Sequence, residues 1–127
     1  MPIGSKAHHL ALPAADAEAS ARWFAEILGL AAPQPDGPDE DMFIVRLNDS
    51  SSVLFVSGPA GPCHHVAFAV SAAEFTAIVD RLKQRGVDFG NDPEDPTNGR
   101  TEDVLGSQGR VYFRSPDGHC LEVTVST

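Results

Sequence analysis

The sequence contains little of what would indicate a secreted, membrane or nucleic-acid-binding protein. Only two of its 127 residues are cysteine, too few for a disulfide framework, so we expect reduced thiols at Cys63 and Cys120. No apolar run approaches the roughly 20 residues that span a bilayer, and the N-terminus lacks the layout of a signal peptide. Nine basic residues against 18 acidic ones disfavour phosphate binding. We therefore expect a cytoplasmic protein that binds neither nucleic acid nor membrane.

The hydrophobic content of 42% is sufficient for one core of ordinary size, so we expect a single domain over residues 1–127. Within it the first and last thirds resemble each other, which indicates two modules, at about residues 5–58 and 62–127. The copies are offset by 56 residues at His9 and His65, by 57 at Gly29 and Gly86, and by 68 at Arg46 and Arg114. The second copy therefore carries about eleven extra residues before Arg110, in a loop that either covers a site or is disordered.

Each module is expected to contain a strand, a helix and then two or three strands. Asp16 can cap a helix from about Ala17 to Leu28, which Gly29 would end. Ser71 and Glu74 form a capping box that begins a second helix, which Gly86 would close. The buried stripe predicted for this second helix consists of Phe75, Ile78, Val79 and Leu82.

Strand alternation places the histidines and one carboxylate on comparable faces. His65 shares a face with two alanines, opposite the bulky residues that must pack against the helix, and His9 repeats this pattern beside Ala11. The segment 115–119 suits a type I turn followed by a left-handed Gly118, and this hairpin register sets Tyr112 opposite Glu122. Glu122 therefore points to the same side as His65.

A carboxylate between apolar strand residues is costly to bury without a partner. Together, His9, His65 and Glu122 form a three-ligand divalent-metal site that leaves coordination positions open. In the alternative interpretation, Glu122 is solvated or pairs with Arg46 or Arg114, and the histidines are ordinary polar strand residues. The matching repeat positions of the histidines favour the metal site.

Several motifs resemble those of the vicinal oxygen chelate superfamily, which includes glyoxalase I, fosfomycin-resistance thiol transferases, extradiol dioxygenases and bleomycin-resistance proteins. The resemblance covers nearly the whole chain. It rests on His9-Leu10-Ala11-Leu12, on Trp23-Phe24 through Leu28-Gly29-Leu30, on His65-Val66-Ala67-Phe68 and, most strongly, on Pro116-Asp117-Gly118-His119-Cys120-Leu121-Glu122.

The resemblance implies an α+β fold of two βαβββ modules, with mixed, mostly antiparallel curved sheets around a cleft. It implies that His9, His65 and Glu122 bind Fe, Mn, Ni, Co or Zn, and that the chain forms a homodimer whose clefts draw ligands from both copies. A small substrate would chelate the metal through two adjacent oxygens, and Tyr112 and Arg114 are our candidate catalytic side chains. His119 is expected to be a polar residue at the tip of the hairpin turn.

One departure from the family pattern narrows the expected activity. The repeat maps Glu122 onto Leu54, where glyoxalase I has a further glutamate ligand that takes part in proton transfer. Leu54 can neither bind a metal nor move a proton, so we expect a lyase-related, thiol transferase or dioxygenase type of enzyme and not a typical glyoxalase I. The alternative is a non-catalytic protein of the bleomycin-resistance kind, which holds a ligand without metal.

Overall fold

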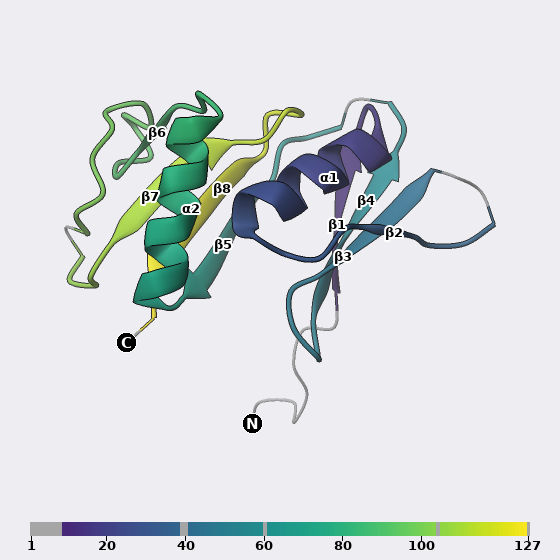
Figure 1. The fold of residues 1–127 in the computed structure, drawn as a ribbon. Coiled ribbons are helices and arrows are strands. Elements are labelled where there is room, and N and C mark those ends of the chain that lie inside the picture. Colours follow the sequence, from purple (N-terminus) through teal and green to yellow (C-terminus); the bar gives the residue numbers. More distant parts are fainter. Residues whose placement is uncertain (1–8, 39–40, 60, 104, 127) are drawn as a thin grey trace, which may run out of the picture. The chain divides into compact units, whose positions relative to one another are not determined.

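A computed structural model describes residues 9–38, 41–59, 61–103 and 105–126. The chain divides into two compact units, Met1–Pro62 and Cys63–Thr127, and each is described here by itself (Figure 1). In its described residues each unit contains one helix and one four-stranded mixed sheet. This arrangement confirms the α+β class with two βαβββ modules. No helix in the described part of the chain is long and apolar enough to cross a membrane.

The first unit pairs its strands in the order β1-β4-β3-β2. Its first strand runs parallel to β4, and the other pairs are antiparallel. The elements are β1 (His9–Ala14), α1 (Ala17–Leu28), β2 (Gln34–Pro35), β3 (Met42–Arg46) and β4 (Ser52–Ser57).

The second unit repeats this topology with the strand order β5-β8-β7-β6. Here β5 is parallel to β8, which lies at the centre of the sheet beside β7. The elements are β5 (His65–Val70), α2 (Ala72–Gln84), β6 (Phe89–Gly90), β7 (Arg110–Arg114) and β8 (Cys120–Val125).

The strand registers confirm the equivalence of the two modules. Ala11 is paired with Leu54 in the first unit, and Ala67 is paired with Glu122 in the second. The predicted hairpin register is also confirmed, because Tyr112 lies opposite Glu122. Leu54 and Glu122 therefore occupy corresponding places on the two sheets.

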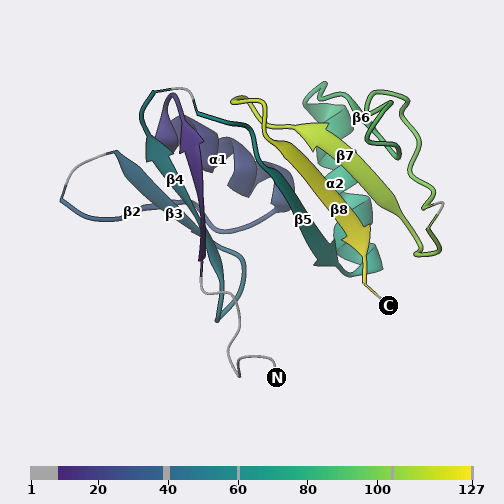
Figure 2. The same ribbon diagram turned by 180° about the vertical axis from the view of Figure 1, so that it is seen from behind.

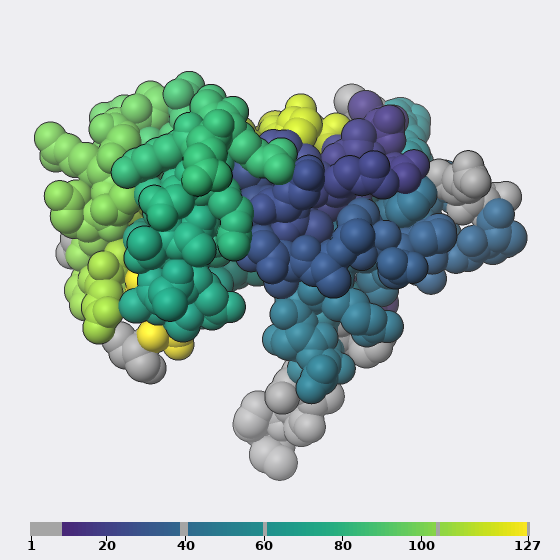
Figure 3. All heavy atoms as spheres, viewed as in Figure 1, coloured from purple at the N-terminus to yellow at the C-terminus, as the bar shows by residue number. Residues whose placement is uncertain are grey.

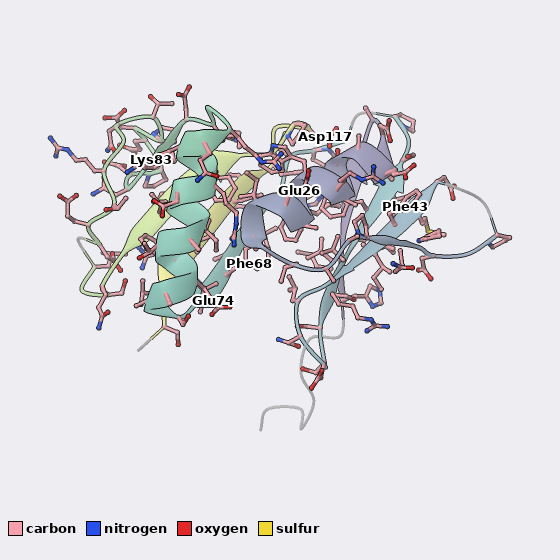
Figure 4. The ribbon with its side chains drawn as sticks, in the orientation of Figure 1. Glu26, Phe43, Phe68, Glu74, Lys83 and Asp117 are labelled. Carbon is pink, nitrogen blue, oxygen red and sulfur yellow. The ribbon has the colours of Figure 1, made fainter. Side chains whose placement is uncertain are left out.

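Local signals determine where the helices begin and end. The Asp16 side chain accepts a hydrogen bond from the Ala19 backbone N–H at 3.1 Å, and Gly29 ends α1 in the left-handed conformation at φ 73°. In α2, Ser71 and Glu74 form both hydrogen bonds of the capping box. Figure 4 shows Glu74 near the start of this helix and Lys83 near its other end. Both predicted helices are confirmed.

The core of the second unit lies between α2 and one face of its sheet. In the space-filling view, α2 and the neighbouring segments cover most of this face (Figure 3). The opposite face of the sheet is not covered by the helix of this unit (Figure 2). The buried core residues of the helix and the two central strands are Phe75, Ile78, Val79, Leu82, Val111, Phe113, Leu121 and Val123.

The long connection between β6 and β7 is folded in its described part. The Asn98 side-chain oxygen accepts hydrogen bonds from the backbone N–H groups of Asn91 at 3.2 Å and Arg100 at 2.8 Å. The Asn91 side chain donates in turn to the carbonyl of Glu102 at 2.8 Å. These bonds hold the turns of the loop together, and the Gly99 N–H donates to the Phe89 carbonyl of β6 at 2.8 Å, which holds the loop to the edge of the sheet.

Candidate functional site

Glu122 lies in β8, one of the two central strands of the second sheet, and its side chain lies on the face away from α2. Its neighbours Leu121 and Val123 are fully buried on the helix face, and alternation turns Glu122 the other way. Only 8% of Glu122 is nevertheless exposed. The side chains that surround it on the adjacent strands account for this burial and define the candidate site.

His65 is the first of these neighbours. Its Nε2 atom lies 2.8 Å from Oε1 of Glu122, while 53% of the histidine side chain remains exposed. The ring of Tyr112 packs edge-on against that of His65, with 6.0 Å between ring centroids. The structure thus brings together three residues that the sequence predicted to share a face: His65, Tyr112 and Glu122.

Arg110 contacts the other oxygen of the carboxylate. Its Nη1 atom donates to Oε2 of Glu122, and its Nε and Nη2 atoms donate to the two oxygens of Asp103 at 2.9 and 3.2 Å. The alternative interpretation of the sequence named Arg46 or Arg114 as the partner of Glu122, but the arginine that binds it is Arg110. Strand alternation could have indicated Arg110, which precedes Tyr112 by two residues. The sequence pattern did not indicate Asp103, because this residue lies in the loop between β6 and β7, where strand alternation does not apply.

Burial and ion pairing shift the proton affinities of these groups. The Arg110 guanidinium holds the pKa of Asp103 well below its usual range, and Asp103 raises the pKa of Arg110. Burial raises the pKa of Tyr112, so its phenol stays protonated at neutral pH. Tyr112 can therefore donate a hydrogen bond to an oxygen that becomes negatively charged.

A cavity of about 610 Å³ lies beside this cluster, within the same unit. Its size falls within the range of small-molecule sites, roughly 300–1,000 Å³. Arg110 and Tyr112 form the wall nearest Glu122, and the rest comes from the loop between β6 and β7. The lining residues from that loop are Asn91, Asp92, Pro93, Asp95, Asn98, Arg100 and Leu105.

Two further site residues were predicted, His9 and Arg114. His9 is the first residue of β1 in the other unit, where it is paired with Ser52 just as His65 is paired with Cys120. Arg114 is exposed at the end of β7, and its Nη1 atom donates to the carbonyl of Gly118 at 3.1 Å. The metal-binding role of His9 and the catalytic role of Arg114 remain predictions.

The expectation for His119 was wrong. Only 2% of this residue is exposed, and its Nδ1 atom accepts a hydrogen bond from the backbone N–H of His64 at 3.0 Å. The turn itself has the predicted form, with Gly118 at φ 85° and its N–H donating to the Ser115 carbonyl at 2.9 Å. His119 therefore connects the hairpin to the residues before β5 and has a structural role.

The donor set suits a divalent cation. An imidazole nitrogen and a carboxylate oxygen face each other, and both are preferred ligands of Fe, Mn, Co, Ni and Zn. Asp103 balances the charge of Arg110, so the negative charge of Glu122 remains to attract a cation. Within the described part of either unit, no three His, Cys, Asp or Glu side chains form a metal-binding group.

Comparison with known proteins places this arrangement in a family. The sequence matches the Glyoxalase/Bleomycin resistance protein/Dioxygenase superfamily over residues 6–123. The chain belongs to this superfamily. The resemblance noted from the sequence motifs is thereby confirmed.

Among solved structures, two oxidases are similar to this chain along nearly its whole length. Oxidase ChaP-H1 is 35% identical, with 98% of each chain covered and a TM-score of 0.88. Oxidase ChaP-H2 is 28% identical, with 98% of this chain and 96% of that one covered and a TM-score of 0.87.

A curated relative, the metallothiol transferase FosB of Shouchella clausii (strain KSM-K16), is 35% identical over 63 residues. That match covers 50% of this chain and only 38% of the relative. The relatives named here are enzymes, but they catalyse different reactions, so superfamily membership does not by itself assign an activity to this chain.

Proposed function

We propose that this protein is a divalent-metal-dependent enzyme of the oxidase and dioxygenase kind, which acts on a small substrate with two adjacent oxygen atoms. The observation that carries the proposal is the His65–Glu122 pair beside a cavity of about 610 Å³. With His9 as third ligand, the set is two histidines and one carboxylate, which is typical of non-haem iron oxygenases. The similarity to oxidase ChaP-H1 along nearly the whole chain supports oxidation over thiol transfer.

The residues of the chain have distinct roles in this proposal. A bound metal would supply Lewis-acid polarisation of the substrate oxygens. His65 and Glu122 would hold this metal, together with His9. Tyr112 donates a hydrogen bond from its neutral phenol to a substrate oxygen, and the loop between β6 and β7 encloses the substrate and limits access of water. Arg114, which is exposed at the end of β7, is the candidate to contact the part of the substrate that lies farthest from the metal.

Metal titration tests the ligand set. We expect wild type to bind Mn²⁺, Co²⁺ or anaerobic Fe²⁺ at one ion per chain. Substitution of His9, His65 or Glu122 by alanine should weaken binding by at least about 100-fold, because each removes a direct ligand. His64→Ala is the matched control, since His64 precedes β5 and its ring lies 5.5 Å from that of His119. If wild type takes up none of Mn, Fe, Co, Ni and Zn, the protein is a metal-free binding protein instead.

Oxygen uptake tests the reaction type. Metal-loaded protein is incubated with a panel of catechols and hydroquinones in an oxygen electrode, and we expect uptake that Glu122→Ala abolishes. Fosfomycin with a low-molecular-weight thiol serves as the comparison substrate pair. Thiol consumption without oxygen uptake would assign the chain to the transferases and contradict the oxidase proposal.

We further propose that the protein is a homodimer in which His9 of one copy completes the site formed by His65 and Glu122 of the other. Mixing His9→Ala with Glu122→Ala subunits should then regenerate one intact site in each mixed dimer. When subunits exchange at random, half of the dimers are mixed and each of these has one of its two sites intact. The mixture should therefore bind about a quarter of the metal that wild type binds. His65→Ala mixed with Glu122→Ala is the control, because both changes fall in the same half-site and no intact site can form. Absence of recovery in the first mixture would show that the three ligands come from one chain.

A further inference from the structure

The ion pair between Asp103 and Arg110 has a geometry that suits the control of a neighbouring carboxylate. The guanidinium donates two hydrogen bonds to Asp103, at 2.9 and 3.2 Å, and one to Oε2 of Glu122. All three side chains are shielded from solvent, with 0% of Asp103, 10% of Glu122 and 16% of Arg110 exposed. A largely shielded arginine that is bonded to two carboxylates has little freedom to move, and the Glu122 carboxylate that it contacts is held in turn.

The loop backbone in turn holds Asp103. One carboxylate oxygen accepts from the N–H of Leu105 at 2.8 Å, and the other accepts from the N–H of Ser107 at 3.1 Å. Asp103 is therefore positioned by the loop independently of Arg110. Asp103 lies in the long connection between β6 and β7, where the second module has its extra residues, and this connection brings it to the sheet.

The first module acts as an internal comparison. With the offset of 68 residues, Arg110 corresponds to Met42 and Tyr112 to Ile44, while Glu122 corresponds to Leu54. The registers agree, because Ile44 is paired with Leu54 as Tyr112 is paired with Glu122. The module without the carboxylate thus has apolar residues at all three positions. Of the two equivalent positions 42 and 110, the one beside the carboxylate holds arginine, which argues that Arg110 serves Glu122 and not the fold that both modules share.

We propose that Asp103 and Arg110 form a positioning pair that binds Oε2 of Glu122 and leaves Oε1 directed toward His65 and the cation. Asp103 neutralises the arginine, so the guanidinium orients the carboxylate without cancelling the attraction of the site for a cation. This inference rests on the metal-binding function proposed above. Outer groups of this kind typically change metal affinity by about 10- to 100-fold when they are removed.

The decisive variant is Arg110→Met, which introduces the residue found at the equivalent position of the first module. A purely electrostatic role predicts that Co²⁺ binds more tightly after this change, because a positive charge near the cation is lost. A positioning role predicts the opposite, about 10- to 100-fold weaker binding, together with a changed visible absorption spectrum of bound Co²⁺ as Glu122 reorients. Arg110→Lys should recover part of the affinity, because lysine can reach one carboxylate but cannot bond to both in the arginine fork geometry.

The experiment measures Co²⁺ affinity by calorimetry and the Co²⁺ spectrum, with circular dichroism and Tm for each variant. Arg22→Met is the matched control, since Arg22 pairs with Glu18 at 2.9 Å on the exposed surface of α1. Affinity and spectrum unchanged in Arg110→Met, or tighter binding, would overturn the positioning role while leaving the metal site intact. Failure of wild type to bind Co²⁺ or any other divalent metal would instead overturn the proposed function, and this inference with it.

Discussion

Gly90 offers a direct test of how the loop is held over the sheet. A Cβ atom added at this position would lie 2.7 Å from the Asp95 carbonyl oxygen, 2.7 Å from the Asn98 side-chain oxygen and 2.8 Å from the Asn98 backbone nitrogen. Ordinary contacts begin at 3.4 Å, so the loop would have to move by about 0.7 Å. Two of the three atoms belong to the backbone, so a change of rotamer cannot relieve the clash.

Gly90→Ala should therefore destabilise the protein by about 1–3 kcal/mol, the usual cost of overpacking a well-fitted position. For a chain of this size the expected decrease in Tm is roughly 4–12 °C. Thermal unfolding and urea titration measure the loss of stability. Amide hydrogen exchange should show faster exchange concentrated in residues 91–98, because Asp95 and Asn98 must move away from β6.

Gly58→Ala is the matched control. Its added Cβ would meet nothing within 4 Å, so the change should be neutral or slightly stabilising. A Gly90→Ala variant with the Tm and exchange rates of wild type would refute the reasoning, since it would show that the loop does not pack on β6 as described.

Three further predictions concern individual contacts. His119→Ala should cost about 1–3 kcal/mol in urea unfolding, because the buried His119 ring is removed and the His64 N–H loses its acceptor, and should leave Co²⁺ affinity unchanged; a large loss of affinity would contradict a structural role. Because the pKa of Asp103 is lowered by folding, its stabilising effect is present above about pH 4 and is lost as the pH falls further. Asp103→Asn should thus be less stable than wild type at pH 7, with a smaller difference near pH 2; a difference that does not depend on pH would contradict this. Ser71→Ala should lower the free energy of unfolding by about 1 kcal/mol through loss of the α2 cap, and an unchanged urea midpoint would show that the cap contributes nothing.

The sequence was sufficient to predict the helices and strands and to predict which strand residues share a face of the sheet. Both helices begin at their predicted caps, and the hairpin before β8 has the predicted register. These features depend on interactions within a few residues, such as the Ser71–Glu74 capping box. The repeat also correctly predicted that Leu54 and Glu122 hold equivalent places, because strand alternation carries over from one module to the other.

The tertiary structure decided which groups surround Glu122. Its arginine partner is Arg110, and the bidentate contact to Asp103 depends on the path of a long loop. Neither the length nor the composition of that loop determines its path, because its turns depend on particular side-chain contacts, such as those of Asn98 with the N–H groups of Asn91 and Arg100.

The burial of His119 likewise depends on a contact across 55 residues of chain. The sequence by itself thus determined the βαβββ repeat and the shared face of His65 and Glu122, because both follow from local periodicity. The charge balance of the site was decided only by long-range packing, because the contacts that set it join segments whose relative placement no local pattern specifies.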